Sequence, residues 1–528
     1  MITKELIVLL VVALAVDTSQ TSTPSSPFYT AGVVEFKTAS STFDASQQVN
    51  NNLAAYLEII ASQEAAETDI IAFPEGTLNS VLQSTFVPDP TSNIVPCKQS
   101  QYAHFLQKLS CQAQISQKYI VVNLIEKENC TKETQAAKND PRPCSNDGLN
   151  IFNTNVVFDR NGTVISRYRK FNLYFEPYNV TLNSEYGEFS TDFGVKFGHF
   201  ICFDMLFYTP TTELVKSKIT DFVFTTMWFS ELPFLTAVQY QQSWAYSYDV
   251  NLLAAGASNP SVGSTGSGIY AGRNGAIVSV MKSSPERKLY VAKVPKKGFK
   301  ESESVPVKQL QIRKKRTITS YMKNLLVKRD PQLDTFTSSP LNKSANHDNL
   351  CHKDLCCHFH YKTTILTPIA NSRSYQYRLA VFDGDRIYEG IKPLGWSVCS
   401  ILACINNTIQ GCALAFDEDV IVSPDLRFDH ILIEANFTKT ENGLIMPNSV
   451  DDSLMPLPVN SFQFNITDIG SKTNARFELL TPKDDLIQFG IYVNFFGERS
   501  SASLGLVSNT LIALCLLLFI MEFKRWRW

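Results

Sequence analysis

The stretch Phe197-Gly198-His199-Phe200-Ile201-Cys202-Phe203-Asp204 carries the pattern that decides the fold. Its apolar run predicts a buried strand that ends at Cys202, and Glu213-Leu214-Val215 has helical character soon after. A thiol at such a strand-to-helix turn is placed like the nucleophile of a hydrolase, with backbone N–H groups nearby to stabilise an oxyanion. A lone cysteine in a buried strand is more often inert packing. The assignment of Cys202 as a nucleophile therefore depends on other residues of the chain.

Outward from this stretch, short β-rich runs alternate with helical ones over residues 29–294. The strand candidates are near-continuous apolar runs, which is typical of sheets covered on both faces. They are Ala31–Phe36, Asp69–Phe73, Tyr119–Glu126, Thr154–Asp159, Thr163–Tyr168, Gly198–Phe203, Asp221–Met227 and Leu252–Ser258. Apolar residues recur at helical spacing in Ser46–Ala66, Ser100–Ser116 and Leu235–Val250. The pattern predicts one α/β layered domain.

Two further polar residues end predicted strands. Glu75 follows the run Ile70–Phe73, at the edge where α/β sheets place ligand sites, and a shielded carboxylate there can act as a general base. Lys170 ends the strand that follows the hairpin signal Asn161-Gly162. Either residue alone is more often a solvated surface residue. Together with Cys202 they form a candidate catalytic set.

The order of Glu75, Lys170 and Cys202 resembles the Glu-Lys-Cys triad of the nitrilase superfamily, and the flanking residues resemble its vanin and biotinidase branch. The resemblance covers most of residues 29–294. The motifs that carry it are Phe73-Pro74-Glu75, Arg169-Lys170-Phe171-Asn172-Leu173, Cys202-Phe203-Asp204-Met205-Leu206-Phe207, Gln242-Ser243-Trp244-Ala245-Tyr246 and Gly266-Ser267-Gly268-Ile269-Tyr270. Gly76-Thr77-Leu78-Asn79 departs from the pattern that commonly follows the first motif.

The resemblance implies an α/β fold of the nitrilase type, an αββα sandwich, that hydrolyses a linear amide through a cysteine thioester. Glu75 would accept the thiol proton and Cys202 would attack the carbonyl carbon. Lys170, together with the backbone N–H of Phe203, would donate to the oxyanion. Glu176 would be the auxiliary carboxylate near the triad. No metal or organic cofactor is expected, because side chains supply the acid, the base and the nucleophile.

The resemblance leaves the substrate open among small-molecule amides. We expect pantetheine, cleaved to pantothenate and cysteamine as by vanins. A biotinidase-like hydrolase acting on biocytin would share the same triad, and a catalytically inactive surface protein that binds a ligand would keep the same fold. The formal net charge of −2 over 528 residues gives no reason to expect a nucleic-acid partner. The oligomeric state is left open.

Both ends of the chain indicate a protein tethered to the extracellular face of the cell membrane. The apolar run Leu6–Val16 suits a secretory signal peptide. Small residues around Ser501, the approximate attachment site, precede the apolar run Leu511–Phe523, as in a GPI-anchor signal. The basic ending Lys524–Trp528 also fits a short tail of a single-pass type I membrane protein, so both anchors stay open.

Seven asparagines begin an N-x-S/T sequence without proline at the middle position, which is expected of glycosylation sites in a secreted chain. They are Asn129, Asn161, Asn179, Asn342, Asn406, Asn436 and Asn465.

Composition shifts after the α/β region and predicts a basic linker. It contains Arg313-Lys314-Lys315-Arg316, which is either a processing site or a solvated loop. The β-rich region that follows resembles the base domain of the same branch. The expected organisation is signal peptide 1–16, catalytic domain 29–294, linker 295–331, smaller disulfide-supported β domain 332–498 and anchor segment 499–528.

The twelve cysteines fall into three groups. Cys515 lies in the anchor segment, and Cys202 should stay reduced as the nucleophile. The others number four in the first domain and six in the second, so each domain could close its own disulfides. Adjacent Cys356 and Cys357 are expected to take different partners. The ten disulfide candidates are Cys97, Cys111, Cys130, Cys144, Cys351, Cys356, Cys357, Cys399, Cys404 and Cys412.

Overall fold

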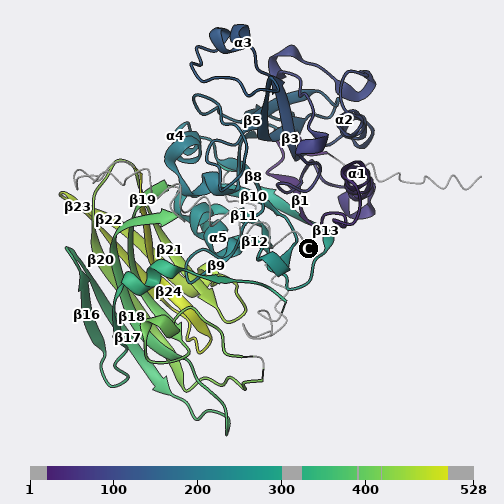
Figure 1. Ribbon diagram of the computed structural model, residues 1–528. Coiled ribbons are helices and arrows are strands. Elements are labelled where there is room, and N and C mark those ends of the chain that lie inside the picture. The colour runs from purple at the N-terminus through teal and green to yellow at the C-terminus, as the bar shows by residue number, and fades with distance from the viewer. Residues whose placement is uncertain (1–20, 300–323, 389–391, 418, 497–528) are drawn as a thin grey trace, which may run out of the picture.

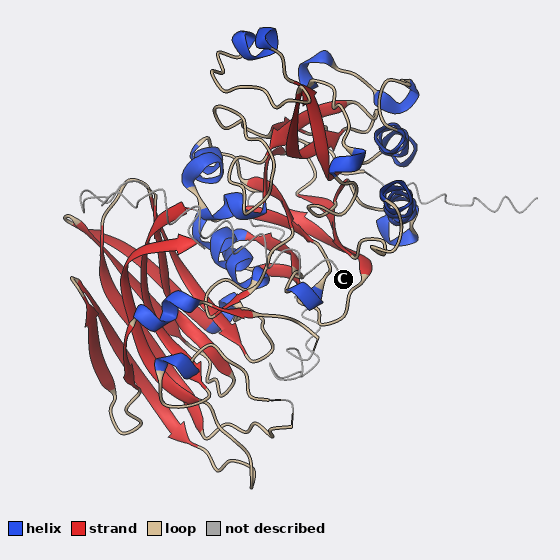
Figure 2. Ribbon diagram, in the orientation of Figure 1, coloured by secondary structure: helices blue, strands red, loops and turns tan. Residues whose placement is uncertain are grey.

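The computed structural model describes residues 21–299, 324–388, 392–417 and 419–496 (Figure 1). They form an α/β body and a second body built almost entirely of strands (Figure 2). The predicted signal peptide, the basic tetrad 313–316 and the tail that includes Ser501 lie outside the described residues. Within those ranges, no helix has the length and apolar character needed to cross a membrane.

Two six-stranded sheets pack face to face in the α/β body. In the first sheet the neighbouring strands are β13 (Arg287–Pro295), β1 (Phe28–Phe36), β2 (Ile70–Ala72), β3 (Tyr119–Asn129), β4 (Leu149–Phe158) and β5 (Val164–Arg169). In the second they are β12 (Ala276–Val280), β11 (Ser267–Ala271), β10 (Asn251–Gly256), β8 (Asp221–Thr226), β7 (Lys196–Ile201) and β6 (Glu188–Ser190). Three central strands of each sheet run parallel. Burial on both faces explains their nearly continuous apolar sequences.

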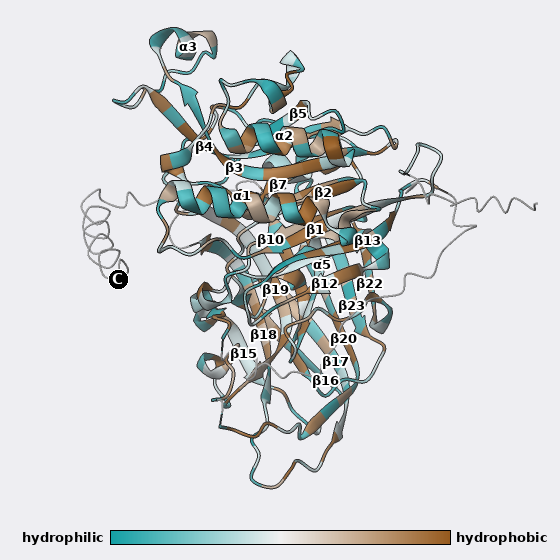
Figure 3. Cartoon of the chain, turned by 90° about the vertical axis from the view of Figure 1, so that its right-hand side faces the viewer, coloured by the Kyte–Doolittle hydropathy of each residue, from teal (hydrophilic) through white to brown (hydrophobic). Residues whose placement is uncertain are grey.

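Helices cover the outer faces of the two sheets. The helices are α1 (Ala45–Ala61), α2 (His104–Ser116), α3 (Lys132–Ala137), α4 (Glu213–Lys216) and α5 (Ala237–Tyr248). α1 and α2 pack on the first sheet, and Figure 3 shows them side by side in front of largely hydrophobic strands. α5 packs on β10 and β11 of the second sheet. The αββα sandwich is therefore confirmed.

The second body is a sandwich of two five-stranded sheets. One contains β15 (Thr337–Pro340), β18 (Gln376–Tyr388), β19 (Lys392–Cys404), β24 (Leu486–Phe495) and β21 (Gly443–Asp451). The other contains β16 (His347–His352), β17 (Leu355–Ile365), β20 (Leu426–Thr438), β23 (Lys472–Leu479) and β22 (Phe462–Ile469). Inward-facing residues alternate with exposed ones along β17 and β20, as expected of strands with one solvated face.

The two bodies share one continuous apolar core. α5 packs against β21, and Phe234 stacks at 5.7 Å, edge to face, on the buried ring of Trp396. Gln239 of α5 donates from Nε2 to Asn448 at 2.8 Å and to Gln488 at 3.0 Å, so this buried amide is paired across the interface. A shared core of this kind holds the second body in a fixed position beside the first.

The end of the predicted linker is folded rather than loose. β14 (Lys328–Arg329) pairs with β9 (Glu231–Leu232) of the α/β body. Leu325 is buried in the shared core, and Asp330 is buried beside it. The described residues 324–331, within the predicted linker 295–331, therefore pack against the two bodies. Basic composition alone could not show this pairing.

The predicted division of the cysteines is confirmed. The α/β body contains the disulfides Cys97–Cys111 and Cys130–Cys144. The second body contains Cys351–Cys356, Cys357–Cys399 and Cys404–Cys412, so the adjacent pair does take different partners. Cys202 is buried and free.

Candidate active site

The structure brings Glu75, Lys170 and Cys202 together at one end of the α/β body. They follow β2, β5 and β7, and their exposed fractions are only 4%, 1% and 8%. The Lys170 Nζ donates to Glu75 Oε1 at 2.7 Å. The charges of Glu75 and Lys170 both act on the thiol. Strand ends far apart in the sequence thus form one buried cluster.

Cys202 occupies a strained turn that presents its sulfur. β7 ends at Ile201, whereas the sequence predicts a strand that continues to Cys202 or Phe203. Cys202 itself has a φ of +46°. This left-handed conformation is costly for a residue with a side chain, and it is common at functional turns. A short 3₁₀ helix, Cys202–Leu206, follows directly. The turn therefore has the strand-to-helix geometry that the sequence predicts.

Asp204 braces this turn from within. Its Oδ2 accepts from the Ile201 backbone N–H at 3.1 Å and from the Tyr168 hydroxyl at 2.8 Å. Its Oδ1 accepts from the backbone and side-chain nitrogens of Asn172 at 2.8 and 2.9 Å. Asn172 lies two residues after Lys170, so one buried carboxylate ties the Cys202 turn to the end of the strand that supplies the lysine.

Glu75 is held as an acceptor by three groups. Besides Lys170, Asn153 donates from Nδ2 at 2.8 Å, and the backbone N–H of Met227 donates to Oε2 at 2.8 Å. Burial raises the pKa of Glu75, but the Lys170 ammonium and these hydrogen bonds outweigh it, so the net pKa lies below the ordinary value. Glu75 is therefore an anion at rest.

Glu176 joins the same cluster. Its Oε1 accepts from Lys170 Nζ at 2.5 Å and from Asn153 Nδ2 at 3.4 Å. Burial raises the pKa of Glu176 to about 7, against the attraction of Lys170, and the nearby Glu75 carboxylate adds to the rise. Lys170 itself is buried, which lowers its pKa, yet the two carboxylates raise the net pKa well above its ordinary value. Lys170 is thus a fixed cation between two carboxyl groups.

The Cys202 thiol is protonated at rest. Burial raises its pKa most, and repulsion by the Glu75 carboxylate raises it further, while Lys170 lowers it by less. A thiolate formed in advance would place a second anion beside Glu75. Transfer of the thiol proton to Glu75 during attack on a carbonyl carbon would avoid this pair of anions, because the new negative charge would develop on the carbonyl oxygen.

A cavity opens at Cys202 and is lined from both bodies. Tyr174, Phe203 and Trp228 contribute from the α/β body, whereas Arg386 and Tyr388 come from the end of β18. The Phe203 ring packs edge to face on Tyr388 at 5.4 Å and against Tyr174 at 5.1 Å. These rings make the cavity beside the thiol largely apolar, and Phe229, which also lines it, is partly exposed to solvent.

Arg386 is buried between two carboxylates at the side of this cavity. Its Nη2 donates to Glu231, and its Nη1 donates to Asp330 at 2.5 Å. Both nitrogens at the end of the guanidinium are thus occupied, and the trio carries a formal charge of −1. Burial raises the pKa of Glu231, while Arg386 opposes the rise. The cavity presents a carboxyl group here rather than a free cation.

Sequence reasoning missed several of these residues. Asn153 links Glu75 to Glu176, but it lies within a strand and carries no local signal beyond its polarity in an apolar run. Arg386 and Tyr388 reach the cavity only through the packing of the second body. Among the described residues, no group of three or more His, Cys, Asp or Glu side chains is placed to hold a metal ion.

All seven predicted glycosylation asparagines lie at exposed positions. They are Asn129, Asn161, Asn179, Asn342, Asn406, Asn436 and Asn465. The folded chain therefore leaves room for a sugar at each.

Comparison with known proteins covers both bodies. A family model described as carbon-nitrogen hydrolase matches residues 31–247, and one described as the vanin C-terminal domain matches residues 325–499. Vanin-like protein 2 of Drosophila melanogaster is 43% identical over 507 residues, which cover 92% of each chain. Pantetheinase of Homo sapiens is 31% identical over 411 residues, covering 74% of each chain. Biotinidase of Bos taurus is 31% identical over 398 residues, covering 67% of this chain and 72% of that one.

Proposed function

The chain belongs to the vanin and biotinidase branch of the carbon-nitrogen hydrolase family, and we propose that it cleaves pantetheine to pantothenate and cysteamine at the cell surface. The observation that carries the proposal is the buried cluster of Glu75, Lys170 and the free Cys202, in which Cys202 lines a cavity. A nucleophile, a base and a buried cation in contact are the groups that amide cleavage through a thioester requires.

Acylation begins with the amide carbonyl above Cys202. The sulfur attacks the carbonyl carbon while the thiol proton moves to Glu75. Lys170 and the Phe203 backbone N–H donate to the oxyanion. Because Lys170 is already a desolvated cation, it needs no reorganisation as negative charge develops. Glu75 then gives its proton to the leaving amine nitrogen, the C–N bond breaks, and a thioester and a free amine result.

Deacylation uses the same groups in reverse order. Glu75, again an anion, removes a proton from water, and the water oxygen attacks the thioester carbonyl. Lys170 stabilises the second oxyanion. The C–S bond breaks, the thiol regains its proton from Glu75, and the carboxylic acid leaves. The three hydrogen-bond donors around Glu75 and Glu176, which are Lys170, Asn153 and the Met227 backbone N–H, keep both carboxyl groups in place through the two steps.

The lining of the cavity favours pantetheine over biocytin. Sequence identity does not separate the two, because it is 31% to both the human pantetheinase and the bovine biotinidase. Pantetheine carries no charge, whereas the lysine part of biocytin carries both an α-carboxylate and an α-ammonium group, and both would lose water on entering an apolar cavity. Arg386 has both terminal nitrogens occupied by Glu231 and Asp330, so it is not free to pair with that carboxylate. The aromatic walls suit the uncharged chain of pantetheine.

Three observations support a place on the extracellular face of the membrane. The described residues contain five disulfides, which are typical of oxidising compartments. The glycosylation sequences all fall at exposed positions. The apolar runs at both ends match a signal peptide and a GPI or transmembrane anchor. We propose GPI attachment near Ser501; release of the protein by a GPI-specific phospholipase would separate this anchor from a transmembrane tail.

The test is a side-by-side assay of the full chain expressed in a secretory host. We expect cysteamine release from pantetheine to exceed biotin release from biocytin, and both Cys202→Ala and Glu75→Gln to abolish turnover. Glu64→Gln, at an exposed position, serves as the matched control and should keep full activity. Equal product release by wild type and Cys202→Ala would show that the enzyme assignment is wrong. A preference for biocytin would overturn the choice of substrate alone.

A further inference from the structure

A second cavity, of about 530 Å³, lies on the opposite face of the first sheet from the triad. Phe152 lines it, and the next residue along β4, Asn153, points the other way to Glu75. Its volume lies within the roughly 300–1,000 Å³ of small-molecule sites. Strands β4 and β5 form its floor, and the segment closed by the Cys130–Cys144 disulfide, which includes α3, forms one wall. The loop from Asn179 to Glu185 forms the other wall.

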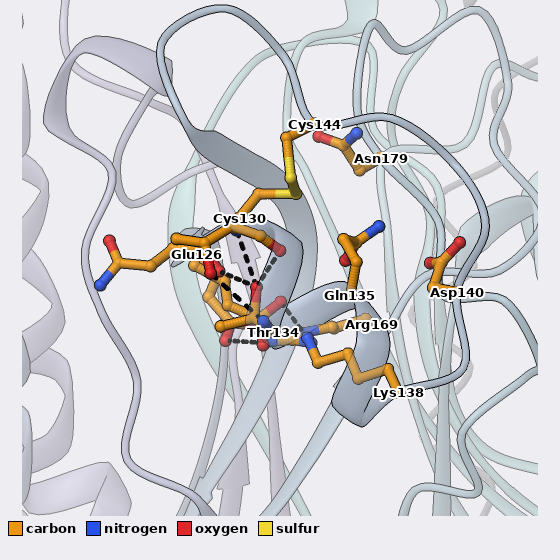
Figure 4. A network of polar contacts seen from close by, with 12 residues as sticks. Glu126, Cys130, Thr134, Gln135, Lys138, Asp140, Cys144, Arg169 and Asn179 are labelled. Atoms are coloured by element: carbon orange, nitrogen blue, oxygen red, sulfur yellow. Dashed lines mark hydrogen bonds and ion pairs between the residues drawn. A yellow bond between two sulfur atoms is a disulfide. The ribbon is translucent and has the colours of Figure 1, made fainter.

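The charged side chains of this cavity neutralise one another. Arg169 donates to Glu126 at 2.6 Å and to Glu128 at 3.0 Å, and Lys138 also pairs with Glu128 (Figure 4). Arg142, on the same wall as α3, pairs with Asp140. A lining of paired charges and amides suits an uncharged, hydroxyl-rich occupant better than an ion. A carbohydrate has that chemistry.

Two buried polar atoms of the lining have no hydrogen-bond partner among the described residues. They are the hydroxyl oxygen of Thr181 and the Nε of Arg167. Buried donors of this kind are rarely left unpaired in a folded protein. An occupant that supplies hydroxyl or carbonyl groups would satisfy both.

Asn179 stands on the rim with its side chain held in one orientation. Its backbone N–H donates to the Ile151 carbonyl, and its Oδ1 accepts from the Ile151 N–H, each at 2.7 Å. The Oδ1 is thereby fixed toward β4, and the Nδ2 is the atom left to carry a substituent. In Figure 4 Asn179 lies above Gln135 and Asp140, two residues of the opposite wall that also line the cavity. Asn179-Val180-Thr181 is one of the seven glycosylation sequences.

We propose that the first sugars of an N-linked glycan on Asn179 fill this cavity and hold its two walls together. The covalent bond would join the Nδ2 of Asn179 to the first sugar, so the occupant belongs to the chain itself. This inference rests on the proposal that the chain enters the secretory pathway, but it is independent of which amide the enzyme cleaves.

The same loop reaches the active site. Glu176 lies three residues before Asn179, and it contacts Lys170 and Asn153. No helix or strand is found between the end of β5 at Arg169 and the start of β6 at Glu188, so tertiary contacts alone position this loop. A sugar anchored between Asn179 and α3 would restrict it and would act on catalysis through Glu176.

The test compares three states of the full chain, made in a host that adds oligomannose glycans. They are the intact glycoprotein, the protein trimmed by an endoglycosidase to a single N-acetylglucosamine at each site, and Asn179→Gln. Asn161→Gln and Asn465→Gln, whose positions are not in this cavity, are the matched controls. Occupancy at each asparagine is measured by peptide mass spectrometry.

We expect Asn179 to be occupied, the trimmed protein to keep its melting temperature and kcat, and Asn179→Gln to lose about 2 °C or more and severalfold in kcat. The two control variants should match wild type. If the glycan acted only by making the surface more soluble, trimming it to one sugar would remove most of its effect on the melting temperature and kcat. The inference would be overturned if Asn179 carried no glycan while other glycosylation sequences did. It would also be overturned if the Asn179→Gln protein had the melting temperature and kcat of the controls. If no sequon were occupied, the secretory proposal itself would fail.

Discussion

Replacing Asp204 by Asn tests how the Cys202 turn is held. The carboxylate accepts four hydrogen bonds, two at each oxygen, from Ile201, Tyr168 and both nitrogens of Asn172. An amide NH₂ in place of either oxygen would face two donors. Two bonds to a charged group would be lost, each contributing about 1.5–3 kcal/mol, so the expected loss of stability is about 3–6 kcal/mol.

The functional effect should exceed the loss of folded protein. Asp204 connects the turn at Cys202 to Asn172, so its loss should misplace the thiol relative to Lys170. We expect kcat to fall by about 10²-fold at a temperature where the variant is still folded, because misplacement of a reacting group by about 1 Å has that effect. Circular dichroism melting and steady-state cysteamine release measure the two quantities.

Asp221→Asn is the matched control for Asp204→Asn. Asp221 is also a buried aspartate with three accepted hydrogen bonds, from Tyr29, Asn251 and Thr220. It begins β8, whereas the site lies beyond the end of that strand at Met227. Asp221→Asn should melt earlier but keep its kcat. If Asp204→Asn kept both its melting temperature and its kcat, or if the two variants lost activity equally, the role of Asp204 as a brace would be refuted.

Three other predictions concern charge. Folding raises the pKa of Glu176 from 4.5 to about 7, so the contribution of this residue to the free energy of unfolding falls as the pH rises through that window. In urea titrations, Glu176→Gln should be more stable than wild type by up to about 3 kcal/mol at pH 8 and equal to it at pH 4.5. Arg386→Met leaves Glu231 and Asp330 buried without their cation, so it should lose about 3–5 kcal/mol in the same titrations. Glu231→Gln leaves the Nη2 of Arg386 with a neutral, weaker acceptor, so this nitrogen can donate to the carboxylate of biocytin, and the ratio of kcat/KM for biocytin to that for pantetheine should rise severalfold. An unchanged ratio would show that Arg386 does not contact the substrate.

The α/β body was predictable from local patterns. Apolar runs locate β1, β2, β3, β7, β8 and β10 within a few residues, and helical spacing locates α1, α2 and α5. The same patterns place Glu75, Lys170 and Cys202 at strand ends, and strand ends of one sandwich meet at one edge. The hairpin that joins β4 and β5 at Asn161-Gly162 is found where its turn signal predicts.

What the sequence did not reveal depends on contacts between distant segments. β13 pairs antiparallel with β1 across more than 250 residues, and its exposed charged residues hide its strand character. Asn153 acquires its role only because β4 places it between Glu75 and Glu176. Arg386 enters the cavity because α5 docks the second body beside it. Such packing between distant segments cannot be read from the local hydrophobic periodicity of the sequence.

The central claim is that amide cleavage passes through a thioester on Cys202. Rapid acid quench of the full-length enzyme during turnover of pantetheine, followed by peptide mass spectrometry, tests it most directly. We predict a pantothenoyl group on the peptide that contains Cys202, its decay as substrate is exhausted, and its absence in Cys202→Ala. An acyl group on another residue, or turnover by Cys202→Ala at the wild-type rate, would contradict the account.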